Sequence, residues 1–158
     1  MRLTKSVKKP SKPLEYALKL LSQRSYSEKK LTEKMISREV DPAEVATVIA
    51  KLKEYGYVND VKYAKDYVES AQNIKLSGPR KIYWQLIKKG ISKETAKDAI
   101  DQTYNNDNEP ERIGEIIKKY ARNIPRDKLY ERLMRRLIAR GYDYTLVKKE
   151  VHDFINSL

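Results

Sequence analysis

The chain lacks cysteine, has one histidine, and contains few glycines and prolines among its 158 residues. Without cysteine it can form neither disulfide bonds nor thiolate metal sites, and a reducing compartment is allowed. The single histidine, His152, cannot build a two-histidine zinc site, and we interpret it as a surface or packing residue. Only 5 Gly and 6 Pro interrupt a sequence rich in Leu, Ile, Lys and Glu, which favours helices over a β-sandwich.

Long apolar runs are also missing. No stretch approaches the roughly 20 apolar residues that are needed to span a bilayer. Residues 1–13 contain five basic residues, two prolines and no acid, and they lack the apolar run of a secretory signal. We therefore expect this segment to be a flexible basic tail, and we expect a soluble, cytoplasmic protein that does not bind a membrane.

No motif for catalysis or cofactor binding is present. The glycines do not form a phosphate-binding loop of either common type, and there is no cysteine or second histidine to pair a nucleophile with a base. Most carboxylates have lysine neighbours, as Glu28 and Glu33 do beside Lys29 and Lys34. The sequence predicts no catalytic residue, no metal site and no cofactor.

An internal repeat organises the chain. A shift of 51 residues brings apolar positions into register three times, among them Leu31, Ile82 and Leu133, and then Met35, Leu86 and Leu137. A helix with apolar spacing 0, 3, 4, 7 precedes each of these segments and starts its stripe at Leu14, Ala64 and Ile113. Such small repeats gain stability mainly from their neighbours. The sequence predicts an all-α fold, an elongated tandem array of three three-helix repeats at residues 14–57, 58–106 and 107–158.

Residues typical of helix ends agree with this division. The middle helix of each repeat begins near Ser27, Ser77 and Pro125. Gly90 and Gly141 follow two of these helices, where a left-handed residue ends a helix at low cost. Glu39 takes that position in the first repeat, so we expect a different cap there. Asp41–Pro42 fits a helix start, and the polar run at 105–110 predicts a loop.

The net charge of +12 is concentrated in three segments. The tail carries +5, residues 78–90 carry +4 and residues 126–140 carry +4, which leaves about −1 for the remainder. Such an excess attracts polyanions, most commonly nucleic acid. Trp84, the only tryptophan, could stack on a base or fill a partner's pocket, although packing between repeats is its expected role. The candidate binding residues are Arg80, Lys81, Trp84, Lys88, Lys89, Arg132, Arg135, Arg136 and Arg140.

Four segments, in this order, resemble the RecX family. They are LEYALKLLSQRSYSEKKLTEKM (14–35), EYGYVND (54–60), SGPRKIYWQLIKKGI (77–91) and LMRRLIARGYDYTLVKKEV (133–151). The residues that carry the family motifs, with an expected structural role, are Gly56, Tyr57, Asn59, Asp60, Gly78, Pro79 and Gly90. The resemblance covers about residues 14–158.

The resemblance implies a regulator of the recombinase RecA. RecX proteins bind RecA and its filament on single-stranded DNA, and most of them inhibit recombinase activity, ATP hydrolysis and strand exchange. This implies a role in homologous recombination, DNA repair and the SOS response. The partners it implies are RecA and single-stranded DNA, with weaker binding to duplex DNA, and we expect a monomer whose cationic residues face the filament.

Two other classes of function fit the residues without the resemblance. A helical transcriptional regulator would read bases in the major groove, usually as a dimer. A protein adaptor would use its positive charge only to match an acidic partner, and it would bind that partner without DNA.

Overall fold

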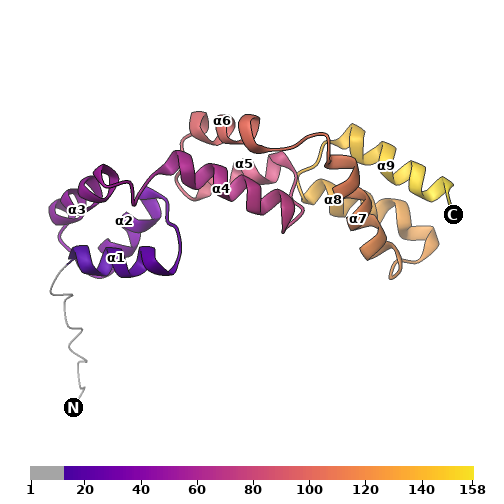
Figure 1. Ribbon diagram of the computed structural model, residues 1–158. Coiled ribbons are helices and arrows are strands. Elements are labelled where there is room, and N and C mark those ends of the chain that lie inside the picture. The colour runs from indigo at the N-terminus through magenta and orange to yellow at the C-terminus, as the bar shows by residue number, and fades with distance from the viewer. Residues whose placement is uncertain (1–12) are drawn as a thin grey trace, which may run out of the picture. The chain divides into compact units, whose positions relative to one another are not determined.

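The computed structural model describes residues 13–158, and all regular elements in this range are helices (Figure 1). The expected basic tail lies outside the described residues except for Pro13, which begins the first helix. The elements are α1 (Pro13–Gln23), α2 (Glu28–Ile36), α3 (Pro42–Glu54), α4 (Asp60–Asn73), α5 (Pro79–Lys88), α6 (Lys93–Thr103), α7 (Glu109–Ala121), the 3-10 helix η1 (Arg126–Lys128), α8 (Leu129–Ala139) and α9 (Tyr144–Asn156). The predicted all-α repeat fold is confirmed. In the described part of the chain, no helix is both long and apolar enough to cross a membrane.

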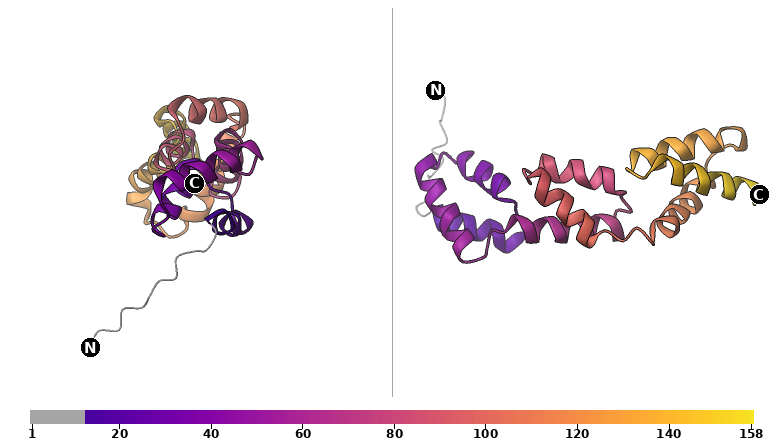
Figure 2. Two further views of the ribbon diagram at one scale, coloured as in Figure 1. Left: turned by 90° about the vertical axis from the view of Figure 1, so that its left-hand side faces the viewer. Right: turned by 90° about the horizontal axis from the view of Figure 1, so that it is seen from above.

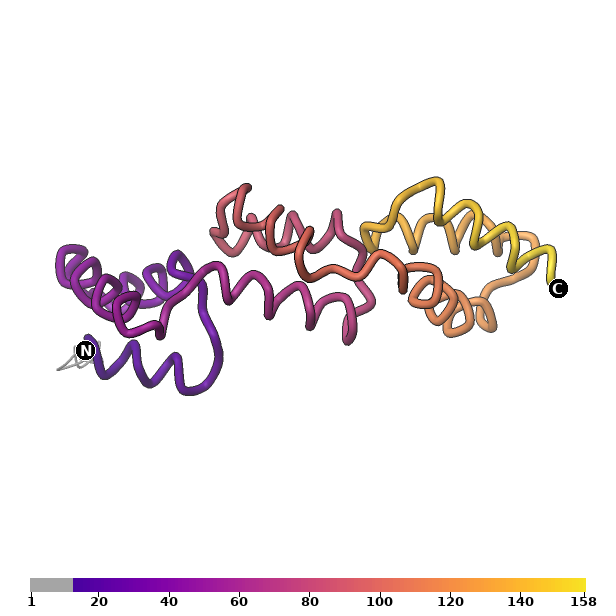
Figure 3. Tube along the Cα trace, turned by 45° about the horizontal axis from the view of Figure 1, so that its top comes forward, coloured from indigo at the N-terminus to yellow at the C-terminus, as the bar shows by residue number. Residues whose placement is uncertain are grey.

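The described residues pack as two compact units. The first contains the residues up to 63 together with 89–91, and the second contains residues 64–88 and 92–158. The first unit therefore holds α1, α2 and α3, while the second combines most of the middle repeat with the last repeat. Figure 3 shows the same helices as a tube along the chain, coloured by residue number. Within the second unit α8 and α9 lie side by side, as the right-hand view of Figure 2 shows.

The aligned apolar positions form the repeat cores. Leu31 and Met35 of α2 have no exposed surface, and the same holds for their counterparts in α5 and α8, which are Ile82, Leu86, Leu133 and Leu137. A third aligned position differs, because Ile36 and Ile138 are 49% and 40% exposed. Two turns of each middle helix thus supply the core, and the next aligned isoleucine reaches the surface.

The helix caps follow the sequence signals with one exception. Asp41 caps α3 by accepting a hydrogen bond from the Ala43 amide, and Gly90 and Gly141 adopt φ of 86° and 88°. The expectation of a different cap at Glu39 was wrong, because Glu39 itself adopts a left-handed φ of 60°. Its amide donates to the carbonyl of Ile36 at 2.9 Å, so the turn forms despite a strain of roughly 1 kcal/mol. The loop after α6 is also shorter than expected, because α7 already begins at Glu109.

Backbone contacts join the middle and last repeats inside the second unit. The amide of Gly78 donates to the carbonyl of Arg140 at 2.7 Å, and the amide of Arg80 donates to the carbonyl of Gly141 at 3.2 Å. The start of α5 therefore satisfies carbonyl groups at the end of α8. A Cβ on Gly78 would lie 2.5 Å from the backbone of Gly141, so only glycine permits this approach.

A buried polar cluster fixes the connection between α6 and α7. The Gln72 side-chain amide donates to the carbonyl of Thr103 at 3.1 Å, and its oxygen accepts from the Asn105 amide at 2.9 Å. Arg112, which is 5% exposed, donates to the carbonyl of Asn105 and lies over the ring of Tyr104. Burial raises the pKa of the Tyr104 hydroxyl, so this group stays neutral. The cluster ties the middle repeat to the last one.

Candidate nucleic-acid interface

Helix α8 separates its apolar residues from its arginines. Leu129, Leu133 and Leu137 are buried, as the sequence predicts, while Arg132, Arg135 and Arg136 are exposed on another face. Arg135 pairs with Glu131, but both side chains are more than 70% exposed. Because such surface pairs contribute at most about 1 kcal/mol, Arg135 can exchange this partner for a ligand.

Tyr120 of α7 gives this arginine face an aromatic platform. The guanidinium of Arg136 lies 3.7 Å from the centre of the Tyr120 ring. Arg140 donates a hydrogen bond of 3.4 Å to the Tyr120 hydroxyl, and this bond together with the nearby positive charges lowers the pKa of Tyr120. The platform and the arginines line an open hollow of about 820 Å³, together with Lys81. Because Arg136 already covers one face of the Tyr120 ring, the hollow mainly offers planar guanidinium groups for phosphates.

Arg140 also has a structural role that the sequence did not indicate. Its guanidinium donates to the carbonyl of Lys75 at 2.7 Å and reaches the carbonyl of Leu76 at 3.5 Å. The hydroxyl of Tyr142 donates to the same Leu76 carbonyl at 2.9 Å. Arg140 therefore holds the segment that follows α4 against the end of α8, and it also forms part of the wall of the hollow.

A second hollow lies along α5. Its lining includes Arg80, Lys81, Trp84 and Lys88, with Ile138 and Ala139 from α8. Arg80 forms only a weak ion pair with Asp143, because the two groups are 3.5 Å apart and both side chains are more than half exposed. The two hollows share Lys81 and Ala139, so they form one continuous surface of the second unit. We call this surface the α5–α8 face.

Trp84 corrects one expectation from the sequence. The side chain is 62% exposed, so it does not pack as a core residue between repeats. Its ring meets that of Tyr83 edge to face, with 5.3 Å between the ring centres. An exposed tryptophan beside Lys88 and Arg80 is well suited to stacking on a base or entering an apolar pocket of a partner.

Lys89 does not belong to the α5–α8 face. It lies in the first unit, where it lines a hollow with Arg24 and Tyr63. The predicted set of binding residues is thus divided, with eight members in the second unit and Lys89 in the first.

The remaining family-motif residues shape the backbone. Gly56 has a left-handed φ of 76°, and Asn59 caps α4 by accepting from the Lys62 amide. Asp60 accepts a hydrogen bond of 2.8 Å from the Glu28 amide at the start of α2. Pro79 begins α5 directly after Gly78, whereas Tyr57 is 60% exposed. These contacts hold the turn before α4 and the start of α2 in place, whereas Tyr57 faces solvent.

The α5–α8 face combines cations with aromatic rings and lacks the groups that metal binding needs. Among residues 13–158, no three His, Cys, Asp or Glu side chains gather as a metal site would require, and His152 is exposed. Spaced arginines and lysines neutralise phosphates or carboxylates, and aromatic rings stack on bases of a single strand. The geometry therefore fits a binding surface for an anionic polymer.

Comparisons with known proteins agree on one family. The family model described as "RecX, first three-helix domain" matches residues 14–52, and "RecX, second three-helix domain" matches residues 59–100. The regulatory protein RecX of Caldanaerobacter subterraneus is 31% identical over 137 residues, which cover 87% of this chain and 68% of that protein. The Clostridioides difficile RecX is 32% identical over 143 residues, which cover 89% of this chain and 66% of that protein. The Listeria welshimeri RecX is 29% identical, and the match covers 55% of its length. The chain therefore spans between about half and two thirds of these relatives.

Solved structures support the fold. The crystal structure of RecX from Lactobacillus salivarius superposes with a TM-score of 0.78 and 24% identity, over 94% of this chain and 97% of that one. A second crystal structure, of a regulatory protein RecX, gives a TM-score of 0.75 and 23% identity. The match covers 92% of this chain and 70% of that one. At this identity the likeness shows the helical repeat fold alone.

Proposed function

Because the chain belongs to the RecX family, we propose that it binds RecA and RecA filaments on single-stranded DNA and inhibits their recombinase and ATPase activity. This activity would place it in the regulation of homologous recombination, DNA repair and the SOS response. The protein itself would act by binding and catalyse no reaction. Two observations support this proposal: the membership of the chain in the RecX family, and the cationic α5–α8 face.

The observation that carries the proposal is the α5–α8 face. It presents Arg132, Arg135 and Arg136 beside the Tyr120 ring, and it continues along α5 to Trp84. A RecA filament offers both the phosphates of its DNA and the carboxylates of its protein surface. Four or five phosphate contacts on a single strand give a salt slope of about −3 to −3.5, which is modest. The protein partner would therefore supply part of the affinity and the specificity.

Inhibition would follow from binding a polymer at several points. A chain that contacts neighbouring RecA protomers or the DNA between them gains avidity, because each further contact forms at high effective concentration. Such a chain can block the addition of protomers while bound to few sites. It would therefore act well below one copy per RecA protomer.

A binding comparison tests who the partner is. The full chain is titrated separately into labelled single-stranded DNA, RecA alone and the assembled filament. Binding is followed by fluorescence anisotropy and by the emission of Trp84. The proposal predicts the tightest binding to the filament, weaker binding to the single strand, and a change in Trp84 emission because this exposed ring becomes covered. Sequence-specific binding to duplex DNA by a dimer would instead support a transcriptional regulator. Equal binding to RecA with and without DNA would support an adaptor. Either result would overturn the proposal.

A further inference from the structure

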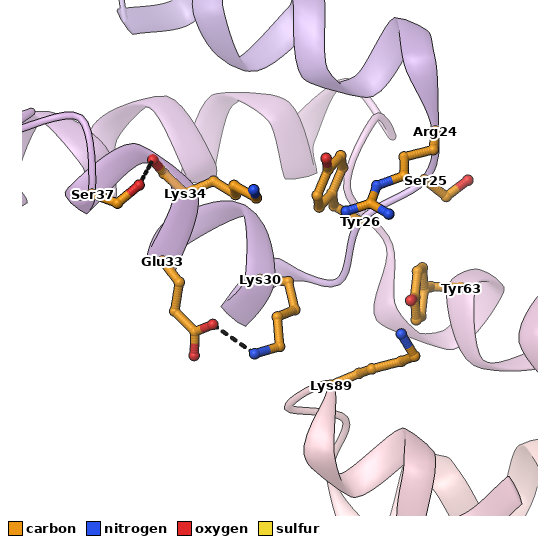
Figure 4. Close-up of a pocket in the computed structure, with 9 residues that line it drawn as sticks. All are labelled: Arg24, Ser25, Tyr26, Lys30, Glu33, Lys34, Ser37, Tyr63 and Lys89. Carbon is orange, nitrogen blue, oxygen red and sulfur yellow. Dashed lines mark hydrogen bonds and ion pairs between the residues drawn. The ribbon is translucent and has the colours of Figure 1, made fainter.

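The first unit contains a cationic hollow of its own. It has a volume of about 440 Å³ and is lined by residues from the loop after α1, helix α2 and the residue that follows it, the start of helix α4, and the segment 89–91 (Figure 4). The lining consists of Arg24, Ser25, Tyr26, Lys30, Glu33, Lys34, Ser37, Tyr63 and Lys89. We call it the Arg24 hollow.

Positive charge dominates the Arg24 hollow. Four basic side chains line it against one carboxylate, that of Glu33. On α2 alone the charge is weak, because Glu33 lies between Lys30 and Lys34. Arg24 and Lys89 change this balance, although they are 65 residues apart in sequence. The fold therefore concentrates charge here that no single helix carries.

Glu33, the one acidic residue that lines the hollow, forms only an exposed ion pair. Lys30 and Glu33 form an ion pair of 2.7 Å, with 42% and 46% of their side chains exposed. The hydrogen bond from Lys30 lowers the pKa of Glu33, so this carboxylate is charged at neutral pH. Because an exposed pair of this kind adds little stability, an incoming phosphate can compete for Lys30.

Aromatic rings hold and flank the cations. The guanidinium of Arg24 lies 4.7 Å from the centre of the Tyr26 ring, which is itself buried, so the arginine is held in place before a ligand arrives. Tyr63 forms another part of the wall, and Figure 4 shows its ring between Arg24 and Lys89. This half-buried ring presents a flat apolar surface next to two cations.

We propose that the Arg24 hollow is a second site for single-stranded nucleic acid, in which Arg24, Lys34 and Lys89 bind backbone phosphates and Tyr63 contacts a base. The inference rests on the proposed function, in which the α5–α8 face takes a strand of the same kind. Several separate cations with an aromatic wall suit a strand better than a lone phosphate, which one arginine fork would satisfy. With a site in each unit, one chain holds a strand at two places and gains avidity.

The test neutralises two cations that line the hollow and compares them with two that do not. In the full chain, Arg24→Gln with Lys34→Gln removes two charges from the hollow, and Lys19→Gln with Lys51→Gln removes two exposed charges elsewhere in the first unit. Both variants lose the same net charge, so a general electrostatic effect is equal in the two. Circular dichroism and the thermal midpoint establish that each variant is folded.

The readout is the affinity for a long labelled oligo-dT at several salt concentrations. We expect the hollow variant to bind about tenfold more weakly at low salt, with a salt slope shallower by about 1.4 because two single-strand phosphate contacts are lost. Glu33→Gln should have the opposite effect and strengthen binding about threefold, since it releases Lys30 and removes a negative charge. The control variant should keep a slope close to that of the unchanged chain.

The outcomes separate this inference from the proposed function. If the hollow variant and its control bind alike, the second site is refuted, while loss of binding on changing the α5–α8 face would leave the proposed function intact. If the hollow variant instead loses binding to anionic lipid vesicles and keeps its affinity for DNA, the ligand is a membrane and the inference is wrong. If the unchanged chain binds no single strand, both proposals fail together.

Discussion

Replacing Arg132, Arg135 and Arg136 with glutamate is expected to abolish binding to RecA filaments and to weaken binding to single-stranded DNA at least about 100-fold. The three side chains line one hollow of the α5–α8 face, and their reversal changes the net charge of the chain from +12 to +6. Attraction to a polyanion then becomes repulsion at the place of contact. Anisotropy with labelled DNA, with and without RecA, measures the loss.

The fold should survive these changes. The three arginines are exposed, and the buried leucines of α8 that hold the helix in place are unchanged. The contact between Arg136 and Tyr120 is lost, at a cost of about 1 kcal/mol. Helix content measured by circular dichroism should therefore stay within error of the original.

A matched control separates position from charge. Lys118, Lys148 and Lys149 are exposed residues of the same unit that line neither hollow of the α5–α8 face. Their replacement by glutamate gives the same net charge of +6 but leaves the face intact. We expect this control to retain most of the filament affinity. Retained binding by the arginine variant, or an equal loss in both, would show that the face is not the binding surface.

Replacing Gly141 with alanine is expected to give the largest loss of stability of any glycine substitution in the chain. Gly141 has a left-handed φ of 88°, and an added Cβ would lie 2.3 Å from the backbone nitrogen of Lys81. Strain and overpacking together cost about 3–5 kcal/mol, which lowers the thermal midpoint by about 6–20 °C. Because this junction joins α5 to α8, binding to DNA should weaken as well.

Two other glycines provide controls that separate backbone strain from overpacking. Gly56 has a left-handed φ of 76° but no atom near its absent Cβ, so Gly56→Ala should cost only about 1 kcal/mol. Gly114 lies inside α7 with open space around it, and Gly114→Ala should stabilise the chain by about 0.5–1 kcal/mol. Urea denaturation followed by circular dichroism measures all three. A Gly141 variant no less stable than the Gly56 variant would contradict the close contact.

Local patterns in the sequence predicted the repeat fold well. The 51-residue register selected positions that proved fully buried, such as Leu31 and Leu133, because one apolar stripe must face each core. Capping residues also gave correct helix ends at Asp41, Gly90 and Gly141. The apolar stripe of a helix and its capping residues depend only on neighbours within a few residues, and a single sequence displays these neighbours directly.

Contacts between distant segments could not be predicted in this way. Arg140 resembles its neighbours in the arginine run, yet it binds the Lys75 carbonyl 65 residues away. Arg112 and Gln72 gave no signal, since buried polar side chains look the same in sequence as exposed ones. The exposure of Trp84 follows from its helix face and from how the last repeat packs, and neither can be derived from residue type.

The most direct measurement of the central proposal is ATP hydrolysis by RecA on single-stranded DNA, with the chain added at ratios far below one per RecA protomer. We expect hydrolysis to decline at a few copies per filament, and we expect the variant with glutamate at Arg132, Arg135 and Arg136 to leave the rate unchanged. A constant rate with the unchanged chain, even at equal amounts and low salt, would show that the chain does not inhibit RecA.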